Sequence, residues 1–178
     1  GMLFLDDVRV GRDRLLGGSE EAFKGTGGRK ASKATFSMER TGVAAMALGI
    51  VDRCLELSVR YAKEREQFGQ PIGGFQLIQL KLAKMEVARM NLQNLVFRHI
   101  EMAAAGEAID FAEASAAKLY SAQTATEVAL EAVQLFGGNG YMAEYEVEQL
   151  ARDAKVLQIY AGTDEIQISQ IARSMLGE

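Results

Sequence analysis

Apolar residues recur at intervals of three and four along most of this chain, which is the spacing of one face of an α-helix. Residues 37–66 form the first such stretch, with Val43, Met46, Ala47, Ile50, Cys54, Leu57 and Tyr61 on one face. Ser37 is a suitable N-cap, because its hydroxyl can accept a hydrogen bond from a free amide of the first turn. Glycine and the only proline, in the stretch 68–71, predict the end of this helix.

Four further helices are expected from the same spacing, at residues 75–104, 110–135, about 144–153 and from 164 onward. Met85 and Met90 are expected in the core of the first of these. Gly106 and the run of glycines at 137–140 separate the helices. The sequence therefore predicts an all-α fold, an antiparallel four-helix-type bundle.

The first 34 residues differ from this pattern. Residues 3–10 have the character of a short strand, and a long linker containing Gly, Lys and Ser follows at 11–34. A connector of that length is typical of a join between domains, so we expect a division into residues 1–34 and 35–178. The stretch Gly25 to Lys30 suggests a phosphate-binding loop, but it lacks the required spacing and the terminal Gly-Lys-Ser/Thr, which favours a flexible linker.

Composition narrows the possible functions. The chain has 178 residues and a net charge of −4, which argues against non-specific binding of nucleic acid. Its single cysteine, Cys54, is expected to be a buried apolar residue in a reducing compartment. Its single histidine, His99, is expected to be structural, and a histidine-based metal site is not expected. No apolar run has membrane-spanning length, and no signal peptide is recognised.

Five short motifs follow one another along the chain. They are residues 4–10 (FLDDVRV), 65–69 (REQFG) followed by Phe75 and Gln76, 134–141 (QLFGGNGY), 152–155 (RDAK) and 159–163 (IYAGT). In this order and at these intervals they resemble the C-terminal half of acyl-CoA dehydrogenases. The resemblance implies that residues 1–34 hold the end of that family's middle β-domain, with Leu15, Leu16 and Gly17 after its last strand. Residues 35–178 then correspond to its C-terminal helical bundle.

The resemblance also implies FAD as the cofactor. The residues implied to contact it are Arg65, Gln67, Phe68, Gln76, Gln134, Gly137, Gly138, Thr163 and Glu165. A guanidinium suits the FAD diphosphate, and the resemblance assigns the Arg65 contact to the flavin of a neighbouring subunit. On sequence alone, an arginine that interacts with the dipole of its own helix is an alternative. The glycines can cap a helix and also allow a close approach of the backbone to a ligand.

The substrate site is implied at Ser37, Arg40, Tyr160, Ala161 and Gly162. In many relatives the position of Ala161 carries the glutamate that removes the substrate α-proton, which alanine cannot do. Glu39 stands where isovaleryl-CoA and long-chain acyl-CoA dehydrogenases carry their base, so the resemblance implies Glu39 as the catalytic base. A solvent-exposed glutamate in the first turn of a helix is the alternative. The backbone N–H of Ala161 would still polarise the thioester carbonyl.

The implied reaction is the oxidation of an acyl-CoA to a 2,3-enoyl-CoA by loss of the α-proton and transfer of the β-hydride to flavin. Electron-transferring flavoprotein is the expected acceptor, and an acyl-CoA oxidase is a close variant. We expect a homo-oligomer, a tetramer or a dimer, in the cytoplasm of a bacterium or in the mitochondrial matrix. This chain alone would be an incomplete and inactive enzyme. A non-catalytic helical domain that oligomerises or binds a partner is the alternative of a different class.

Overall fold

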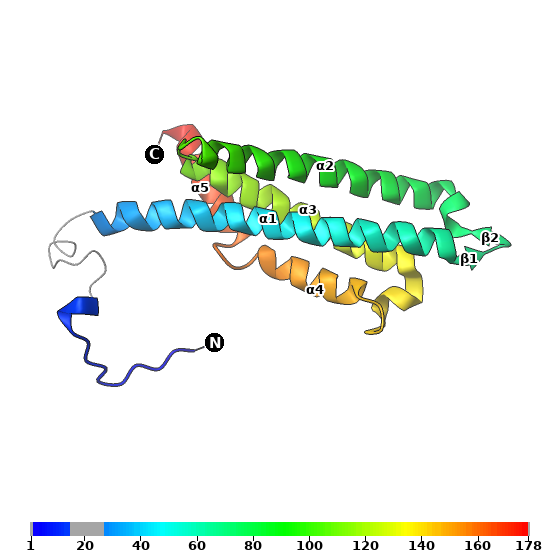
Figure 1. Ribbon diagram of the computed structural model, residues 1–178, viewed down its shortest axis with the longest axis horizontal. Helices are drawn as coiled ribbons and strands as arrows, with labels where there is room; N and C mark the ends of the chain where they lie inside the picture. The colour runs from blue at the N-terminus through cyan, green and yellow to red at the C-terminus, as the bar shows by residue number, and fades with distance from the viewer. Residues whose placement is uncertain (1, 15–26, 178) are drawn as a thin grey trace. The chain divides into compact units, whose positions relative to one another are not determined.

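The computed structural model describes residues 2–14 and 27–177, and the described part is almost entirely helical (Figure 1). Its elements are η1 (Arg12–Arg14), α1 (Gly27–Glu64), β1 (Glu66–Gln67), β2 (Gln70–Pro71), η3 (Ile72–Gly74), α2 (Gln76–Ala104), α3 (Phe111–Phe136), η4 (Gly137–Tyr141), α4 (Val147–Leu157) and α5 (Asp164–Leu176). The predicted all-α bundle is confirmed. Contacts separate residues 1–35 from residues 36–178, and each unit is described by itself.

The first unit departs from two of the predictions. Residues 2–10 contain no strand, since a strand needs a neighbour to pair with and the described residues offer it none. The first long helix begins at Gly27, ten residues before Ser37. Ser37 is therefore an interior residue of α1 rather than its N-cap, and Glu39 is not in the opening turn. The predicted segments 15–17 and 25–26 lie outside the described residues.

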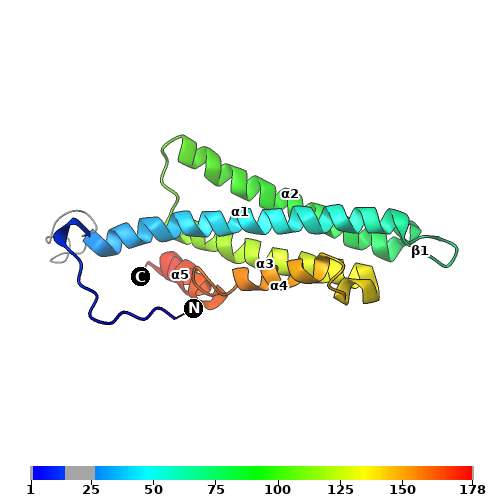
Figure 2. The same ribbon diagram turned by 60° about the horizontal axis from the view of Figure 1, so that its bottom comes forward.

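The second unit is organised around α3, which contacts α2, α4, α5 and η4 (Figure 2). Alanine allows α3 to contact so many elements, because small side chains on the buried faces of α3 let the neighbouring helices approach closely. The buried alanines are Ala114, Ala117, Ala122, Ala125, Ala129 and Ala132. In Figure 2, α5 and α4 follow one another along α3, with α5 near the end where α3 begins. The turn between α4 and α5 is therefore held against the first half of α3.

An aromatic cluster fixes the opposite end of the unit. The rings of Tyr61 in α1 and Phe136 in α3 stack with 4.0 Å between their centroids, and Tyr145 packs edge-on against both. Asn139 Nδ2 donates to the Tyr61 hydroxyl at 2.9 Å. The glycine-rich turn η4 is thus tied to the end of α1, next to the β1–β2 hairpin.

Several single residues behave as predicted and two do not. Cys54, His99 and Met85 are buried, and burial raises the pKa of Cys54 to about 12. Met90 is exposed instead of lying in the core, and Met46 is exposed although it belongs to the predicted apolar face of the first helix. A helical repeat of apolar residues does not show which edge of the face the neighbouring helices cover. None of the helices in the described part of the chain combines the length and the apolar content needed to cross a bilayer.

Candidate functional site

A tight turn connects α4 to α5 at Tyr160, Ala161, Gly162 and Thr163. Ala161 has φ of 55° and Gly162 has φ of 94°, so two consecutive residues have positive φ. This region favours glycine, and an alanine there is strained. Thr163 is the N-cap residue of α5. Among the described residues, no acceptor receives a hydrogen bond from the backbone N–H of Ala161, Gly162 or Thr163.

Two buried side chains hold the carbonyl groups of this turn. Lys118 of α3 donates from Nζ to the Gly162 oxygen at 2.8 Å. Gln167 of α5 donates from Nε2 to the oxygens of Gly162 and Ala161, at 2.8 and 3.1 Å. The sequence analysis missed both residues. A signal was present for Lys118, because it lies midway between the buried Ala114 and Ala122 at a spacing of four.

A carboxylate completes the support of the turn. Asp164 Oδ1 lies 3.5 Å from Lys118 Nζ, and its other oxygen accepts from the side chains of Gln158 and Gln123 at 3.0 and 3.2 Å. Burial lowers the pKa of Lys118, and the Asp164 carboxylate opposes that change. The turn therefore rests on a polar network, buried at Lys118 and Gln167, that is drawn from α3, α5 and the end of α4.

The middle part of α1 faces the same turn. The Tyr160 hydroxyl contacts Met46 Sδ at 3.3 Å. The pKa of Tyr160 is raised, mainly by burial and secondly by the negative charge of Glu39. The Glu39 carboxylate therefore interacts electrostatically with the Tyr160 hydroxyl. Glu39 itself is exposed, and Ser37 is half-buried. The predicted base and the predicted substrate turn thus lie within electrostatic range of each other, but the described residues do not shield Glu39 from water.

Arg40 is turned inward beside Glu39. It is only 4% exposed, donates from Nη1 to Ser115 Oγ at 2.7 Å and lies 4.0 Å above the ring of Phe111. Burial lowers its pKa, and the charge of Glu39 opposes this. Its Nε is buried without an acceptor among the described residues. A buried cation with a free donor is a suitable partner for an oxygen of a ligand.

Glu165 stands at the start of α5. Its own backbone amide and the Thr163 hydroxyl hold the pKa of Glu165 below its usual value. The carboxylate is thus already engaged with the helix start, where negative charge is favoured. Thr163 and Glu165 belong to this end of the unit, away from the other residues predicted to bind the cofactor.

Those other residues gather in a groove of about 910 Å³ at the opposite end. The predicted residues that line it are Arg65, Gln67, Phe68, Gln76, Gly137 and Gly138, while Gln134 is exposed in the last turn of α3. The two ends are joined by α3, on which Lys118 and Phe136 are separated by about 27 Å at 1.5 Å per residue. One domain therefore presents two separate sets of predicted cofactor contacts.

The groove is built from exposed polar side chains, an aromatic ring and glycine. Phe68 is 93% exposed with φ of 53°, and its ring meets Phe75 edge-on. Gly137 has φ of 62° and ψ of −137°, a conformation open only to glycine. At Gly138 an added Cβ would meet no atom of this chain within 4 Å. Nothing inside the chain requires glycine at 138, which fits a ligand that approaches the backbone there.

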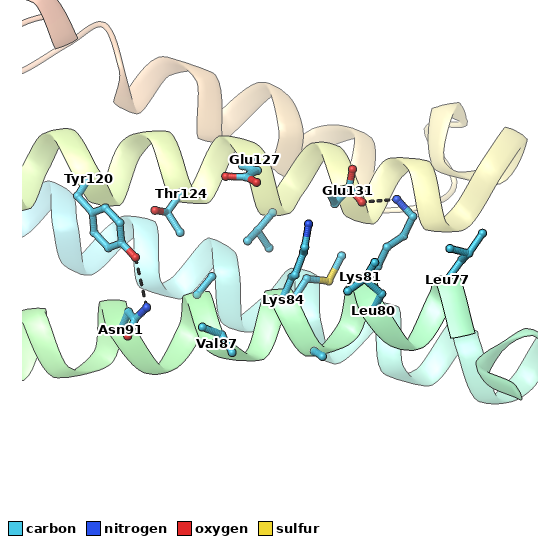
Figure 3. Close-up of a pocket in the computed structure, with 14 residues that line it drawn as sticks. Leu77, Leu80, Lys81, Lys84, Val87, Asn91, Tyr120, Thr124, Glu127 and Glu131 are labelled. Carbon is cyan, nitrogen blue, oxygen red and sulfur yellow. Dashed lines mark hydrogen bonds and ion pairs between the residues drawn. The ribbon is translucent and has the colours of Figure 1, made fainter. Parts of the chain in front are cut away.

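A second groove, of about 730 Å³, lies between α2 and α3 (Figure 3). Leu77, Leu80 and Val87 expose apolar surface along it. Lys81 of α2 forms an ion pair with Glu131 of α3, and Asn91 Nδ2 lies 3.5 Å from the Tyr120 hydroxyl. The sequence analysis did not predict this groove, because it forms only where two helices meet.

Comparison with known proteins gives a consistent result. A family profile described as "Acyl-CoA dehydrogenase, C-terminal domain" matches residues 26–176. An acyl-CoA dehydrogenase of Bacillus subtilis is 42% identical over 175 residues, which are 98% of this chain and 44% of that protein. A 3-(aryl)acrylate reductase of Clostridium sporogenes is 39% identical over 174 residues, with the same two coverages. The chain thus spans less than half the length of these relatives.

Solved structures agree with the sequences. The structure of butyryl-CoA dehydrogenase from Megasphaera elsdenii superposes with a TM-score of 0.79 and 41% identity, covering 83% of this chain and 38% of that one. The likeness thus extends to the arrangement of the helices.

Proposed function

Because this chain belongs to the acyl-CoA dehydrogenase family, whose C-terminal domain it carries, we propose that the full-length protein is an FAD-dependent acyl-CoA dehydrogenase. It oxidises an acyl-CoA to a 2,3-enoyl-CoA. The observation that carries the proposal is the meeting of the Tyr160–Thr163 turn, with its free amides, and the Glu39–Arg40 segment of α1. The domain alone, as present here, is incomplete for catalysis.

The turn acts on the thioester. The N–H of Ala161 donates to the thioester carbonyl oxygen, which stabilises the negative charge that develops there as the α-proton leaves. Tyr160 and Gly162 line the acyl group, while Arg40 and Ser37 contact the substrate from α1. Because Ala161 carries no carboxylate, the turn keeps its hydrogen-bond donors and supplies no base.

Glu39 is the base in this proposal. It takes the α-proton on its carboxylate, and it is the acidic residue whose charge reaches Tyr160. Its exposure in the described residues fits an incomplete pocket, since abstraction of a weakly acidic proton requires exclusion of water. We propose that the remaining part of the full-length protein covers this carboxylate.

The residues present fit FAD in two separate places. Arg65 can grip a diphosphate, Phe68 offers an aromatic face, and Gly138 leaves room for a close approach at the groove. Thr163 and Glu165 lie at the Lys118 end of α3 and the groove lies at its Phe136 end, about 27 Å away along the helix, so we assign the two sets of contacts to different flavins. We propose that the groove holds the adenosine diphosphate half of a neighbouring subunit's FAD. When bound, FAD supplies an acceptor for the β-hydride.

Such a division of contacts requires a homo-oligomer. The groove between α2 and α3 offers a contact surface for a second copy, since its apolar floor is flanked by Lys84 on α2 and by Glu127 on α3 (Figure 3). In a two-fold arrangement, residues of one groove meet the complementary residues of the same groove on the partner. A dimer or tetramer would then bring the two sets of flavin contacts together.

A reaction with electron-transferring flavoprotein distinguishes the dehydrogenase from an oxidase, which passes electrons directly to oxygen. The 39% identical relative named a reductase also favours testing the reverse direction. Reduction of an enoyl group uses the same carbonyl donor and the same acid–base residue. The direction is read from which substrate, acyl-CoA or enoyl thioester, changes the flavin spectrum.

The test uses the full-length protein. It is expected to be yellow when purified and to lose its flavin colour when an acyl-CoA is added without oxygen. Glu39→Gln is expected to keep the colour and lose the bleaching, whereas Glu64→Gln, at the exposed end of α1, keeps both. Bleaching retained by Glu39→Gln refutes the base, and a protein that binds no flavin favours the non-catalytic alternative.

A further inference from the structure

The support beneath the Tyr160–Thr163 turn has features that a simple loop does not need. Lys118 and Gln167 are both fully buried, come from different helices and direct their donors at two consecutive carbonyls. Neither residue belongs to the set proposed above. Because each carbonyl is part of a peptide group, these two donors also affect the direction of the backbone amides of the turn.

The geometry of the peptide group determines that direction. In a trans peptide the C=O and the N–H point to opposite sides, and this chain has no cis peptide bond among its described residues. The Ala161 carbonyl shares its peptide with the Gly162 amide, and the Gly162 carbonyl shares its peptide with the Thr163 amide. Holding both carbonyls inward therefore turns both amides away from the buried network.

The same contacts fix the strained residue. Ala161 has positive φ, and its carbonyl is held by Gln167 on one side while Tyr160 N–H donates to Val156 O at 3.2 Å on the other. The Ala161 amide lies between these two anchors. Without them the turn would be free to relax toward a more favourable backbone conformation and re-aim that amide.

Lys118 adds a charge to the geometry. Its ammonium donates to the Gly162 oxygen at 2.8 Å, whereas the carboxylate of Asp164 lies farther away at 3.5 Å and receives donors of its own from Gln158 and Gln123. A cation on a carbonyl oxygen polarises the peptide group to which the oxygen belongs, which here makes the Thr163 N–H a stronger hydrogen-bond donor. The Lys118 ammonium thus lies closer to the Gly162 oxygen than to the Asp164 carboxylate.

We infer that Lys118, with Gln167, is a positioning residue of the substrate site: by holding the carbonyls of Ala161 and Gly162, the two side chains fix the turn so that the Ala161 amide faces the carbonyl oxygen of a CoA thioester. This inference rests on the proposed function. Lys118 touches no substrate and acts through the peptide of Gly162. Its effect is specific to ligands that carry a carbonyl oxygen at this place.

The experiment compares two ligands of the full-length protein. One is the thioester product of the proposed reaction, a 2,3-enoyl-CoA, and the other is the matching thioether, which lacks the carbonyl oxygen. The wild-type protein is expected to bind the thioester more tightly. Lys118→Met is expected to lower that preference about tenfold, the factor for one ordinary hydrogen bond, and to leave thioether affinity unchanged. Lys63→Met, an exposed lysine of α1, keeps the preference. Isothermal calorimetry measures all affinities, with flavin content and melting temperature as checks of folding.

The possible results distinguish failure of the proposed function from failure of the positioning role of Lys118. If wild type binds neither ligand, the proposed function fails. If wild type prefers the thioester and Lys118→Met keeps that preference, or weakens both ligands equally, the positioning role is refuted. If Lys118→Met does not fold, the same ratio is measured for Gln167→Met, where an unchanged preference refutes the role and a reduced one supports it.

Discussion

At the scale of single residues, Lys118 is a cationic side chain placed in the interior of the protein. It is fully buried, and burial lowers its pKa despite the nearby Asp164 carboxylate. Its interactions therefore do not compensate the loss of hydration, and the charge costs stability. A residue that is costly and still points at a functional turn is better explained by the site than by folding.

This cost predicts a specific pH dependence. Because the folded pKa lies below the unfolded value of about 10.4, the unfolded chain binds more protons between those two values. The free energy of unfolding contributed by Lys118 should rise as the pH passes upward through that window. Lys118→Met should lack this pH dependence, so wild type should gain stability relative to the variant as the pH rises to about 10. Urea unfolding at several pH values measures this, and a constant difference between the two proteins contradicts it.

Ala161 gives a second prediction at this scale. Its φ of 55° is unfavourable for any residue with a Cβ, so Ala161→Gly should raise the free energy of unfolding by about 0.5–1 kcal/mol. Ala129→Gly, a buried position inside α3, should lower it by about 1 kcal/mol or more. The same urea measurement distinguishes them, and a loss of stability in Ala161→Gly would show that the backbone is not strained there.

At the scale of elements, the helices were predictable wherever an apolar face meets the core. The helix that begins after Asp110 was expected at 110, and Asp110 caps it through hydrogen bonds to the amides of Ala112 and Glu113. The start of α1 was wrong because its first ten residues extend beyond the apolar pattern. There, only the helix propensity of residues such as Ala31 and Lys33 indicates a helix. A pattern of apolar positions cannot locate a helix start that lies ahead of the first apolar residue in the pattern.

Sequence motifs predicted the candidate-site residues that lie within the motifs and missed those that lie outside them. The motifs indicated the turn at Tyr160, the groove at Arg65 and the glycines at 137 and 138, and the structure brings most of the groove residues together. Lys118 and Gln167 were missed because their role depends on contacts between α3, α5 and the turn. No local pattern shows which carbonyl a buried side chain will meet. The roles of Glu39 and of the flavin contacts stay predictions.

The two adjacent glycines of η4 should separate stability from cofactor binding. Gly137→Ala forces a side chain into a glycine-only conformation and should lower the free energy of unfolding by about 1–3 kcal/mol. Gly138→Ala meets no atom of this chain, so it should leave the melting temperature of the apoprotein nearly unchanged. It should nevertheless reduce the flavin content of the full-length protein. Equal flavin content in wild type and Gly138→Ala would argue that no ligand approaches the backbone there.

At the scale of the whole molecule, the two sets of predicted flavin contacts lie at opposite ends of α3, and the proposed function therefore makes flavin binding depend on assembly. The groove between α2 and α3 is the surface proposed for that assembly, with basic Lys84 on one side and acidic Glu127 on the other (Figure 3). In an isologous contact each lysine meets the partner's glutamate, so the attraction occurs twice. Complementary charges at the rim of an apolar contact set register and partner choice more than total affinity.

This arrangement predicts a charge-reversal pattern. Lys84→Glu and Glu127→Lys, made singly, each place two like-charge pairs in the two-fold contact and should weaken association of the full-length protein about tenfold or more, whereas the double variant should recover most of it. Lys63→Glu, on the exposed end of α1, should leave association unchanged. Sedimentation velocity over a range of concentrations measures the oligomeric state. Flavin content should follow the oligomeric state, because a dissociated subunit would lack the neighbour whose Arg65 is proposed to bind its FAD diphosphate. If the single variants stay assembled, the α2–α3 groove is not the contact surface, and the proposed sharing of FAD between subunits would require a second copy to approach through another face.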